Sequence, residues 1–349
     1  MKRKRITIEE LAEKANVSIA TVSRVLNNKG NVKKETKDHV IQIMQEYDFH
    51  PQNPHIFSDP GSNLLLTCVP DFCNPFYSPV IDGIQKAAHE NNYDVIFLQS
   101  RDYYTEISDF SNILKEKSIA GILILSSVPH IELIRELSFK CPVIMCCEYP
   151  EDYDMSYVTI NDVAATVTAM NYLVLTGCKK IGLMNSSLKF KYARHRERGF
   201  LQALEEHELE VNPEWVSHIS SINYNLAYSE ALHILQLPDR PDAMFACSDV
   251  YGIAIVNAAK HLGLRVPEDL SVIAFDNTET SIMSDPPLTT IDQPKQQIGY
   301  QSCEMLIDKI KSPSTANKQV VLGTQLIIRG STLLPTQRPA SHPSAPAVL

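Results

Sequence analysis

The sequence contains no long hydrophobic run, and this absence excludes an integral membrane protein with a spanning helix. No apolar stretch approaches the roughly 18–20 residues that such a helix needs. The basic start, Lys2-Arg3-Lys4-Arg5, leads into an acidic amphipathic stretch rather than an apolar one, so it lacks the pattern of a secretory signal. We therefore expect a cytoplasmic protein with no membrane partner.

The spacings that mark metal sites and common enzyme sites are also absent. The eight cysteines include no C-x-x-C pair and none of the histidine spacings typical of zinc, so we expect buried free thiols, no metal and no cofactor. The chain has no G-x-S-x-G elbow, P-loop, G-x-G-x-x-G or H-E-x-x-H motif. Asp249 and Asp276 could in principle form the carboxylate pair of a glycosidase. The N-terminal pattern described below favours a protein that is not an enzyme.

Charge is divided unevenly along the chain. Residues 1–50 hold ten Lys/Arg and seven Asp/Glu, a balance of +3, whereas the whole chain has a formal net charge of −9. The remaining residues therefore carry −12. A basic head on an acidic body suits a protein that touches DNA only through its head, because the field that acts on DNA is local.

The first 47 residues have the pattern of a helix-turn-helix. Thr7 and Glu10 have the spacing of a capping box, and apolar residues then recur at helical intervals. Asn16 ends that helix, and Ser18 is suited to cap the next one. A third helix, at about residues 34–47, would close a small three-helix core.

The second helix of this pattern has an apolar face and an outward face. Val22, Val25 and Leu26 fall on the apolar face, which would pack on the other two helices. The outward face is small, polar and basic, and its residues are not needed for a core: Ile19, Ala20, Ser23, Arg24 and Asn27. Such a helix fits the major groove of DNA. A generic three-helix bundle is the alternative that the pattern alone leaves open.

Beyond residue 63, apolar strand-like runs alternate with amphipathic helices. Near-continuous apolar runs between helices are typical of parallel strands covered on both faces, so this part of the chain is predicted to be α/β. The predicted strands are Leu64–Val69, Asp94–Leu98, Gly121–Leu125, Val143–Cys146, Lys180–Met184, Ala243–Ala246 and Ser271–Phe275.

The N-terminal residues closely resemble the headpiece of the LacI–GalR family of bacterial transcription regulators. The residues that carry the resemblance are Ile6-Thr7-Ile8-Glu9-Glu10-Leu11-Ala12, then Val17-Ser18, then Thr21-Val22-Ser23-Arg24-Val25-Leu26-Asn27. Family landmarks continue in order to about Leu334. The resemblance implies an all-α headpiece and a periplasmic-binding-protein-like core of two doubly wound parallel-sheet lobes. It also implies a homodimer that binds double-stranded operator DNA under the control of a small-molecule effector.

Pattern and resemblance together divide the chain into four parts. We expect the headpiece at 1–51, a hinge or linker at 52–62, the effector-binding and dimerisation domain at 63–334, and a disordered Pro/Ser-rich tail at 335–349. The lobe nearer the DNA would span about 63–161 and 293–323, and the distal lobe about 162–290 and 324–334. The chain would cross between the lobes near residues 161–162, 289–294 and 323–324.

The resemblance also assigns roles to the headpiece residues. Ile19, Ala20 and Arg24 should face base edges, with Arg24 as the main polar reader, of guanine. Ile19 and Ala20 offer no side-chain hydrogen bonds, so specificity there would come from thymine methyl groups and DNA shape. Residues expected to contact phosphates or to fix the helix are Thr7, Ser18, Thr21, Ser23 and Asn27.

The hinge departs from the family pattern. Relatives carry an Ala-Arg-x-Leu run whose Leu wedges into the minor groove, and both the Arg and the Leu are absent from residues 53–61 here. A short helix remains possible, because Asn53 can cap it and Pro54 suits its first position. Ile56 or Phe57 could then be the wedge, and we select Phe57. A flexible tether with no role at DNA is the alternative.

Polar and aromatic residues follow several predicted strands, where ligands bind in open parallel sheets. Phe76 and Tyr77 end a run that matches the family's Pro-Asp-x-x-Asn-Pro-Phe-Phe/Tyr, and Arg196 matches an arginine that reaches into the cleft, where it would face Asp249 and Asp276. The expected effector contacts are Phe76, Tyr77, Ser126, Ser127, Glu148, Phe190, Arg196, Ser248, Asp249, Asp276 and Gln293. Lobe packing is the alternative for Arg196, Asp249 and Asp276, and plain core packing for the two aromatic residues.

Two departures from the family bear on the ligand. Ser248 replaces the usual Asn, and Phe190 stands where some nucleobase-binding relatives carry an Arg, which speaks against a purine. We therefore predict a sugar or sugar derivative, with an amino-sugar left open by Glu148, Asp249 and Asp276. The predicted function is a ligand-responsive, sequence-specific transcriptional repressor. A transcriptional activator with the same headpiece and a cytoplasmic small-molecule-binding protein are the alternatives.

Overall fold

The structure is a computed structural model that describes residues 8–26, 32–47, 49, 62–99, 119–125, 134, 137–138 and 141–335. The chain divides into two compact units. Unit 1 comprises Met1–Thr159 and Lys295–Val320, and unit 2 comprises Ile160–Pro294 and Val321–Leu349, so the chain passes between them three times. Several sequence predictions lie outside the described residues: those for Thr7, Asn27, Phe57, Ser126 and Ser127, most of the hinge, and the tail after residue 335.

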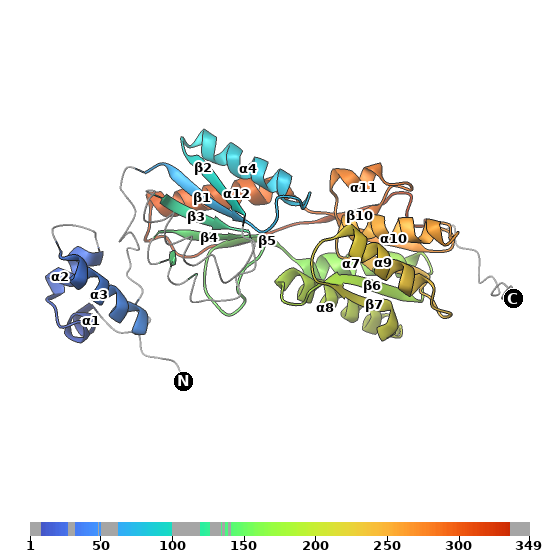
Figure 1. Cartoon of the computed structure of the whole chain (residues 1–349), viewed down its shortest axis with the longest axis horizontal. Coiled ribbons are helices and arrows are strands. Elements are labelled where there is room, and N and C mark those ends of the chain that lie inside the picture. Colours follow the sequence, from blue (N-terminus) through green and yellow to red (C-terminus); the bar gives the residue numbers. More distant parts are fainter. Residues whose placement is uncertain are drawn as a thin grey trace. The chain divides into compact units, whose positions relative to one another are not determined.

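Three short helices at the N-terminus form the helix-turn-helix that the sequence predicts. They are α1 (Ile8–Lys14), α2 (Ile19–Leu26) and α3 (Lys34–Glu46) (Figure 1). Asn16 lies between α1 and α2 with a φ of 51°, a left-handed conformation that asparagine adopts more readily than most residues. The core that joins the three helices consists of Leu11, Ala12, Ala15, Val22, Val25, Val40, Met44 and Phe49.

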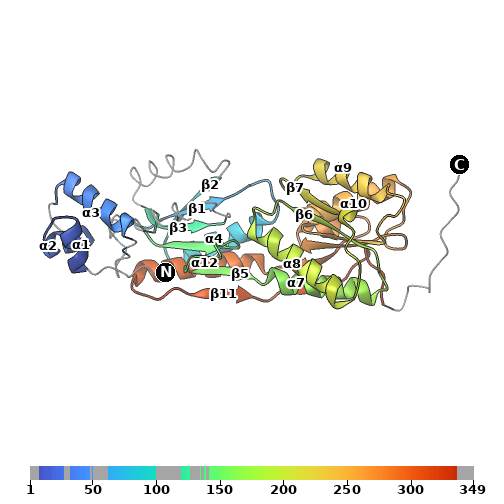
Figure 2. The ribbon, with the colours of Figure 1, turned by 90° about the horizontal axis from the view of Figure 1, so that it is seen from below.

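Unit 1 also contains a six-stranded sheet in the order β11-β5-β4-β3-β1-β2. Its strands are β1 (Leu64–Val69), β2 (Asp94–Gln99), β3 (Ile119–Ile124), β4 (Val143–Cys146), β5 (Tyr157–Ile160) and β11 (Gln319–Leu322). The neighbouring pairs β2–β1, β1–β3, β3–β4 and β4–β5 are all parallel. Strands β3 and β4 are buried along their whole length. In Figure 2, β11 runs along the edge of this sheet beside β5.

Two helices of unit 1, α4 (Tyr77–Glu90) and α12 (Lys295–Lys311), approach each other very closely. A Cβ added at Gly83 would lie 2.0 Å from the Gln296 carbonyl oxygen, and one added at Gly299 would lie 2.0 Å from the Val80 carbonyl oxygen. Only glycine leaves room for the backbones at these two positions.

Unit 2 is built on a second six-stranded sheet, in the order β12-β10-β9-β8-β6-β7. Its strands are β6 (Ile181–Ser186), β7 (Val216–Ile219), β8 (Ala243–Ala246), β9 (Ser271–Asp276), β10 (Thr289–Asp292) and β12 (Gln325–Ile327). All neighbours pair in parallel except β10 and β12, which are antiparallel. This arrangement and that of unit 1 confirm the predicted doubly wound α/β class.

Helices cover both faces of the second sheet. They are α7 (Asp162–Leu175), α8 (Lys191–Glu206), α9 (Tyr224–Leu235), α10 (Asp249–His261) and the short α11 (Glu279–Met283), with a 3-10 turn at Pro213–Trp215. Figure 2 shows α7 and α8 together on one side of the sheet and α9 and α10 together on the other. No helix in the described part of the chain combines the length and apolar character needed to cross a bilayer.

The predicted strands form where the sequence places them. Those at Leu64–Val69, Val143–Cys146 and Ala243–Ala246 have the predicted bounds, and the other four differ by one or two residues at one or both ends. Five strands, β5, β7, β10, β11 and β12, were not predicted; each spans three or four residues, too few for a clear apolar pattern. Strand β10 falls in the segment 289–294, where the sequence predicts a crossing. In the structure this segment first pairs with β9, and the chain leaves unit 2 only after Pro294.

Candidate functional site

The outward surface of α2 is the candidate DNA-contact surface. Ile19 is 51% exposed, and Ala20 and Arg24 are also exposed. Val22 and Val25 are buried on the opposite face, so the core fixes the rotation of the helix about its own axis. The outward face presents the Arg24 guanidinium and the apolar side chains of Ile19 and Ala20, a surface that can read base edges in the major groove.

Ser18 caps α2 as predicted. Its Oγ accepts a hydrogen bond from the Thr21 N–H at 3.0 Å and lies 2.8 Å from Thr21 Oγ1. The first turn of α2 contains no acidic side chain, so the positive end of the helix dipole is not neutralised there and suits a phosphate. Ser23 lies within α2, but its side chain is not described.

Arg196 is the centre of a buried ionic cluster in unit 2. Its Nε donates to Asp162 Oδ1 at 3.0 Å, its Nη1 lies 3.7 Å from Asp276 Oδ1, and Nη1 also donates to the Cys247 carbonyl. These partners come from the first residue of α7, the last residue of β9 and the residue after β8. The cluster therefore lies at the carboxyl edge of the second sheet, where open α/β folds bind ligands.

Two aromatic rings contact the Arg196 guanidinium. Its Cζ lies 3.6 Å from the centroid of the Phe275 ring and 4.9 Å from that of the Tyr192 ring. Tyr192 and Arg196 are four residues apart on α8 and so share one helix face. These cation–π contacts and the directional hydrogen bonds together hold the guanidinium in place.

Neighbouring carboxylates stabilise the protonated form of Arg196. Burial by itself would lower the pKa of the guanidinium, but the charges of Asp162 and Asp276 outweigh burial and raise the pKa above its ordinary value. Arg196 is therefore a permanent cation at this edge of the sheet.

Lys191 and Asp162 belong to the same cluster, and the sequence did not identify either as a site residue. Lys191 Nζ lies 3.3 Å from Asp162 Oδ2, and both side chains are almost fully buried. Asp162 therefore bonds Arg196 through one oxygen and Lys191 through the other. A lysine in a helix is normally solvated, so its sequence position gave no signal of this burial. The only signal for Asp162 was its place at a predicted crossing.

Asp276 and Gln293, both expected effector contacts, are hydrogen-bonded to each other. Gln293 Nε2 donates to Asp276 Oδ1 at 2.7 Å, and both residues are buried. Asp276 has a φ of 109° and the following Asn277 a φ of 51°, both in the positive region that side chains disfavour. Such backbone strain is concentrated at ligand sites in proteins, which fits this position at the end of β9.

Asp249 and Ser248 organise the start of α10. One oxygen of the Asp249 carboxylate accepts from the Thr278 N–H at 2.6 Å and the Thr278 hydroxyl at 2.8 Å, and the other accepts from the Thr290 hydroxyl at 2.7 Å. Ser248 is the N-cap, with its Oγ accepting from the Tyr251 N–H at 3.4 Å. These contacts give Asp249 a clear structural role in addition to the effector role that the sequence proposed.

The remaining predicted residues lie in two places. Phe190 precedes α8 and stacks on Tyr192, with ring centroids 5.4 Å apart. In unit 1, Phe76 is buried and meets Tyr77 edge to face at a centroid distance of 5.1 Å. Glu148 is buried just after β4.

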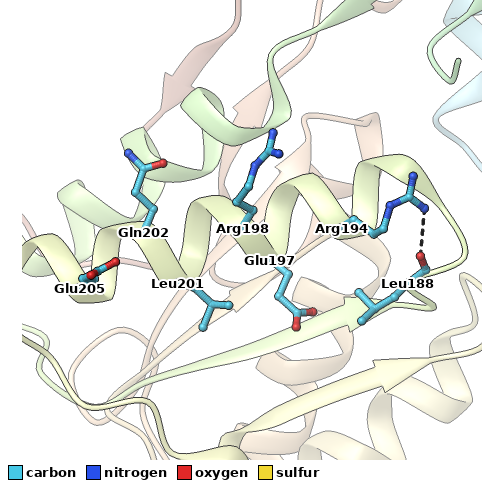
Figure 3. A pocket seen from close by; sticks show the side chains of 7 residues that line it. All are labelled: Leu188, Arg194, Glu197, Arg198, Leu201, Gln202 and Glu205. Atoms are coloured by element: carbon cyan, nitrogen blue, oxygen red, sulfur yellow. Dashed lines mark hydrogen bonds between the residues drawn. The ribbon is translucent and has the colours of Figure 1, made fainter. Parts of the chain in front are cut away.

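The outer face of α8 carries a separate surface groove. Figure 3 shows Arg198 and Gln202 pointing to one side of the helix and Glu197 and Leu201 to the other. Arg194 Nη1 donates to the Leu188 carbonyl at 3.1 Å (Figure 3). Because Arg196 is on the buried face of α8, this groove does not include the ionic cluster.

Comparison with known proteins links both parts of the chain to regulators. Residues 7–52 match the family described as bacterial regulatory proteins, lacI family, and residues 170–332 match the periplasmic binding protein-like domain. The HTH-type transcriptional repressor CytR of Escherichia coli strain K12 is 33% identical over 328 residues, 93% of this chain and 96% of CytR. The NTD biosynthesis operon regulator NtdR of Bacillus subtilis strain 168 is 32% identical over 329 residues, 93% of this chain and 99% of NtdR.

A solved structure agrees with this relationship. The complex of the transcriptional regulator CelR with cellobiose superposes with a TM-score of 0.72 and 26% sequence identity, covering 94% of this chain and 100% of CelR. Together with the exposed helix-turn-helix surface and the two doubly wound sheets, these matches show that the chain belongs to the LacI family of bacterial regulatory proteins and is a DNA-binding transcription regulator.

Proposed function

We propose that this protein is a cytoplasmic repressor that binds its operator as a homodimer and whose operator affinity is set by a sugar or sugar-derivative effector. The observation that carries the proposal is the buried group of Arg196, Asp276 and Gln293, linked over 3.7 and 2.7 Å at the carboxyl edge of the second sheet. It combines a fixed cation, a carboxylate and an amide, and paired donors and acceptors of this kind are what a polyhydroxylated ligand needs.

The aromatic residues beside this group support a ring-shaped ligand. Phe190 and Tyr192 stack with their planes 18° apart, next to the cation that Tyr192 contacts. We assign further effector contacts to Ser248, Asp249 and Phe190 in unit 2, and to Phe76, Tyr77, Ser126, Ser127 and Glu148 in unit 1. An amino-sugar remains compatible with the carboxylates in this set.

The names of the relatives favour a sugar effector and repression of transcription. The structure of CelR contains cellobiose, and the ribose operon repressor of Haemophilus influenzae is 27% identical over 329 residues. CytR, at 33% identity, is a repressor, which favours repression over activation here.

We propose that operator binding uses a headpiece at residues 1–51 and a hinge at residues 52–62. We assign base contacts to Ile19, Ala20 and Arg24, and phosphate or positioning contacts to Thr7, Ser18, Thr21, Ser23 and Asn27. Phe57 is the proposed hinge wedge. If Phe57→Ala leaves both operator affinity and DNA bending unchanged, Phe57 does not intercalate.

Effector control requires that the effector binds one state of the protein better than another. If the effector changes operator affinity by some factor, operator DNA must change effector affinity by the same factor. This reciprocity separates true control from two unrelated binding activities.

The test begins with thermal unfolding of the full chain in the presence of a panel of monosaccharides, disaccharides, amino-sugars and nucleosides. Each compound that raises the unfolding temperature is then added to a fluorescence-anisotropy titration of the gene's own upstream DNA. The proposal predicts a sugar hit that changes operator affinity by about 5–150-fold. A nucleoside hit with no sugar hit would overturn the effector class, and a sugar hit with no effect on operator binding would overturn control.

A further inference from the structure

Two adjacent cysteines lie at the carboxyl end of β4 in unit 1. The Cys146 and Cys147 Sγ atoms are 3.8 Å apart. Cys146 is fully buried as the last residue of the strand, whereas Cys147 is partly exposed. The pair therefore joins a partly exposed cysteine to a fully buried one.

The backbone at this pair is strained. The Glu148 N–H donates to the Cys146 carbonyl at 2.9 Å, and Cys147 between them has a φ of 71°. A hydrogen bond from residue i+2 to residue i around a positive φ is the rare, strained form of the γ-turn. Strain of this kind is retained mainly at functional positions.

The same residue is tied to the next strand. The Cys147 N–H donates to the Val158 carbonyl at 2.9 Å, and the Cys147 carbonyl accepts from the Thr159 hydroxyl at 2.7 Å. Thr159 is the last residue of unit 1 before the chain first enters unit 2. A change in the Cys147 backbone would therefore act directly on the segment that joins the two units.

Three cysteines outside the pair differ from it in their surroundings. Burial raises the pKa of the Cys247 thiol to about 11 and that of Cys303 to about 12, so both stay protonated and out of reach of solvent. Cys73 is exposed and lies in the loop between β1 and α4. Within the ranges that the structure describes, no three His, Cys, Asp or Glu side chains are grouped to hold a metal ion. Two neighbouring thiols can be oxidised to a disulfide and reduced again.

We propose that Cys146 and Cys147 form an oxidative modification site that closes reversibly to a disulfide between neighbouring residues. A peroxide such as hydrogen peroxide oxidises Cys147, whose sulfur takes one oxygen as a sulfenic acid while one water leaves. The Cys146 sulfur then attacks the Cys147 sulfur, the S–O bond breaks, and a second water leaves. Two thiols and one peroxide thus give one disulfide and two waters, and a dithiol reductant reverses the reaction.

The consequence of closure rests on the proposed function. The disulfide would place the Cys146–Cys147 peptide bond inside a small covalent ring, which restricts the torsions that now produce the γ-turn. The hydrogen bonds to Val158 and Thr159 and the position of Glu148, an assigned effector contact, must then change. Oxidised protein is expected to bind its effector about fivefold or more weakly than reduced protein.

The test uses the full, reduced chain treated with hydrogen peroxide, blocked with N-ethylmaleimide, digested and examined by tandem mass spectrometry. The peptide holding Cys146 and Cys147 should lose two hydrogens and escape alkylation, and dithiothreitol should restore both thiols. Cys73→Ser should leave this result unchanged, and Cys147→Ser should abolish it. Oxidation confined to Cys73, or oxygen added at Cys147 while the Cys146 thiol remains, would overturn the proposal.

A second measurement on the unaltered chain avoids any folding defect of the variants. Phenylarsine oxide, which bridges two neighbouring thiols, should bind once per chain and protect both sulfurs from N-ethylmaleimide. Retention of alkylation at both sulfurs would contradict the proposal. Neither readout involves DNA or effector, so disulfide formation can be tested even if the proposed function fails.

Discussion

Arg196 Nη1 lies 3.7 Å from Asp276 Oδ1, and both side chains are buried in unit 2. The two residues are 80 positions apart in the sequence, one on α8 and one at the end of β9. Asp162 holds the other side of the guanidinium, so the cation is fixed before any ligand arrives. Preorganisation of this kind lowers the cost of binding, because no side chain has to be ordered by the ligand.

Arg196→Lys should weaken effector binding by about 30-fold or more, because truncating one member of a buried charge pair typically costs about 2–5 kcal/mol. Lysine keeps the charge but loses the planar fork that bonds Asp162 and stacks on Phe275. Isothermal calorimetry with the sugar hit measures the loss. Arg198→Lys, on the exposed face of the same helix, is the matched control and should bind like the unaltered chain. Equal affinities for the two variants would show that Arg196 does not contact the effector.

Asp249→Ala should lower the free energy of unfolding by about 2–5 kcal/mol, because the buried N–H and hydroxyls of Thr278 and Thr290 lose their acceptor. Denaturant titration followed by circular dichroism measures the change. Asp239→Ala is the control: that carboxylate is 63% exposed and pairs with an exposed Lys180, so less than about 1 kcal/mol is expected. A stable Asp249→Ala protein that has lost only effector binding would assign Asp249 to the ligand instead of to the fold.

Gly299→Ala should destabilise unit 1 by about 1–3 kcal/mol or more, because the new methyl would lie 2.0 Å from the Val80 carbonyl oxygen and α4 would have to move away from α12. At Gly323, by contrast, an added Cβ meets no atom within 4 Å. Gly323→Ala should therefore leave thermal unfolding nearly unchanged. Similar unfolding temperatures for the two variants would contradict the close approach of the helices.

Asp269 should give a stability contribution that disappears in acid. A side-chain hydrogen bond from Arg265, at 2.8 Å, lowers the pKa of Asp269 to about 2. Because the folded-state pKa lies below the unfolded value of about 4, the contribution is complete above pH ~4 and is lost as pH falls towards 2. The difference in unfolding temperature between the unaltered chain and Asp269→Asn should therefore shrink over this pH range. A difference that stays constant from pH 6 to pH 2.5 would refute the depressed pKa.

The parts of the fold that were predictable are those with local signals. The buried strand Val143–Cys146 is a continuous apolar run, and Ser18 directly precedes an apolar-periodic helix, where serine acts as an N-cap. Both features could therefore be predicted from neighbouring residues. Strand β11 could not, because its residues alternate between exposed and half-buried and it is ordered by its place beside β5.

The candidate site follows the same rule. Arg196, Asp276 and Gln293 were predicted from motifs, and the structure brings them together. Lys191 was missed because its burial depends on the packing of α8 against α7, which no short stretch of sequence encodes. The pairing of Asp249 with Thr278 and Thr290 likewise depends on contacts between distant strand ends.

The central claim, that α2 reads operator DNA, is tested most directly by fluorescence anisotropy of the gene's own upstream DNA with the unaltered chain and with Arg24→Ala. Arg194→Ala, an exposed arginine of unit 2, is the charge-matched control. We predict that the unaltered chain and the control discriminate this DNA from a scrambled duplex, and that both lose roughly 10³–10⁵ in affinity between 50 and 200 mM salt. Arg24→Ala should lose about 1–3 kcal/mol of discrimination for each half-site. Equal discrimination by Arg24→Ala and the control, or no preference of the unaltered chain for its upstream DNA at either salt concentration, would contradict the account.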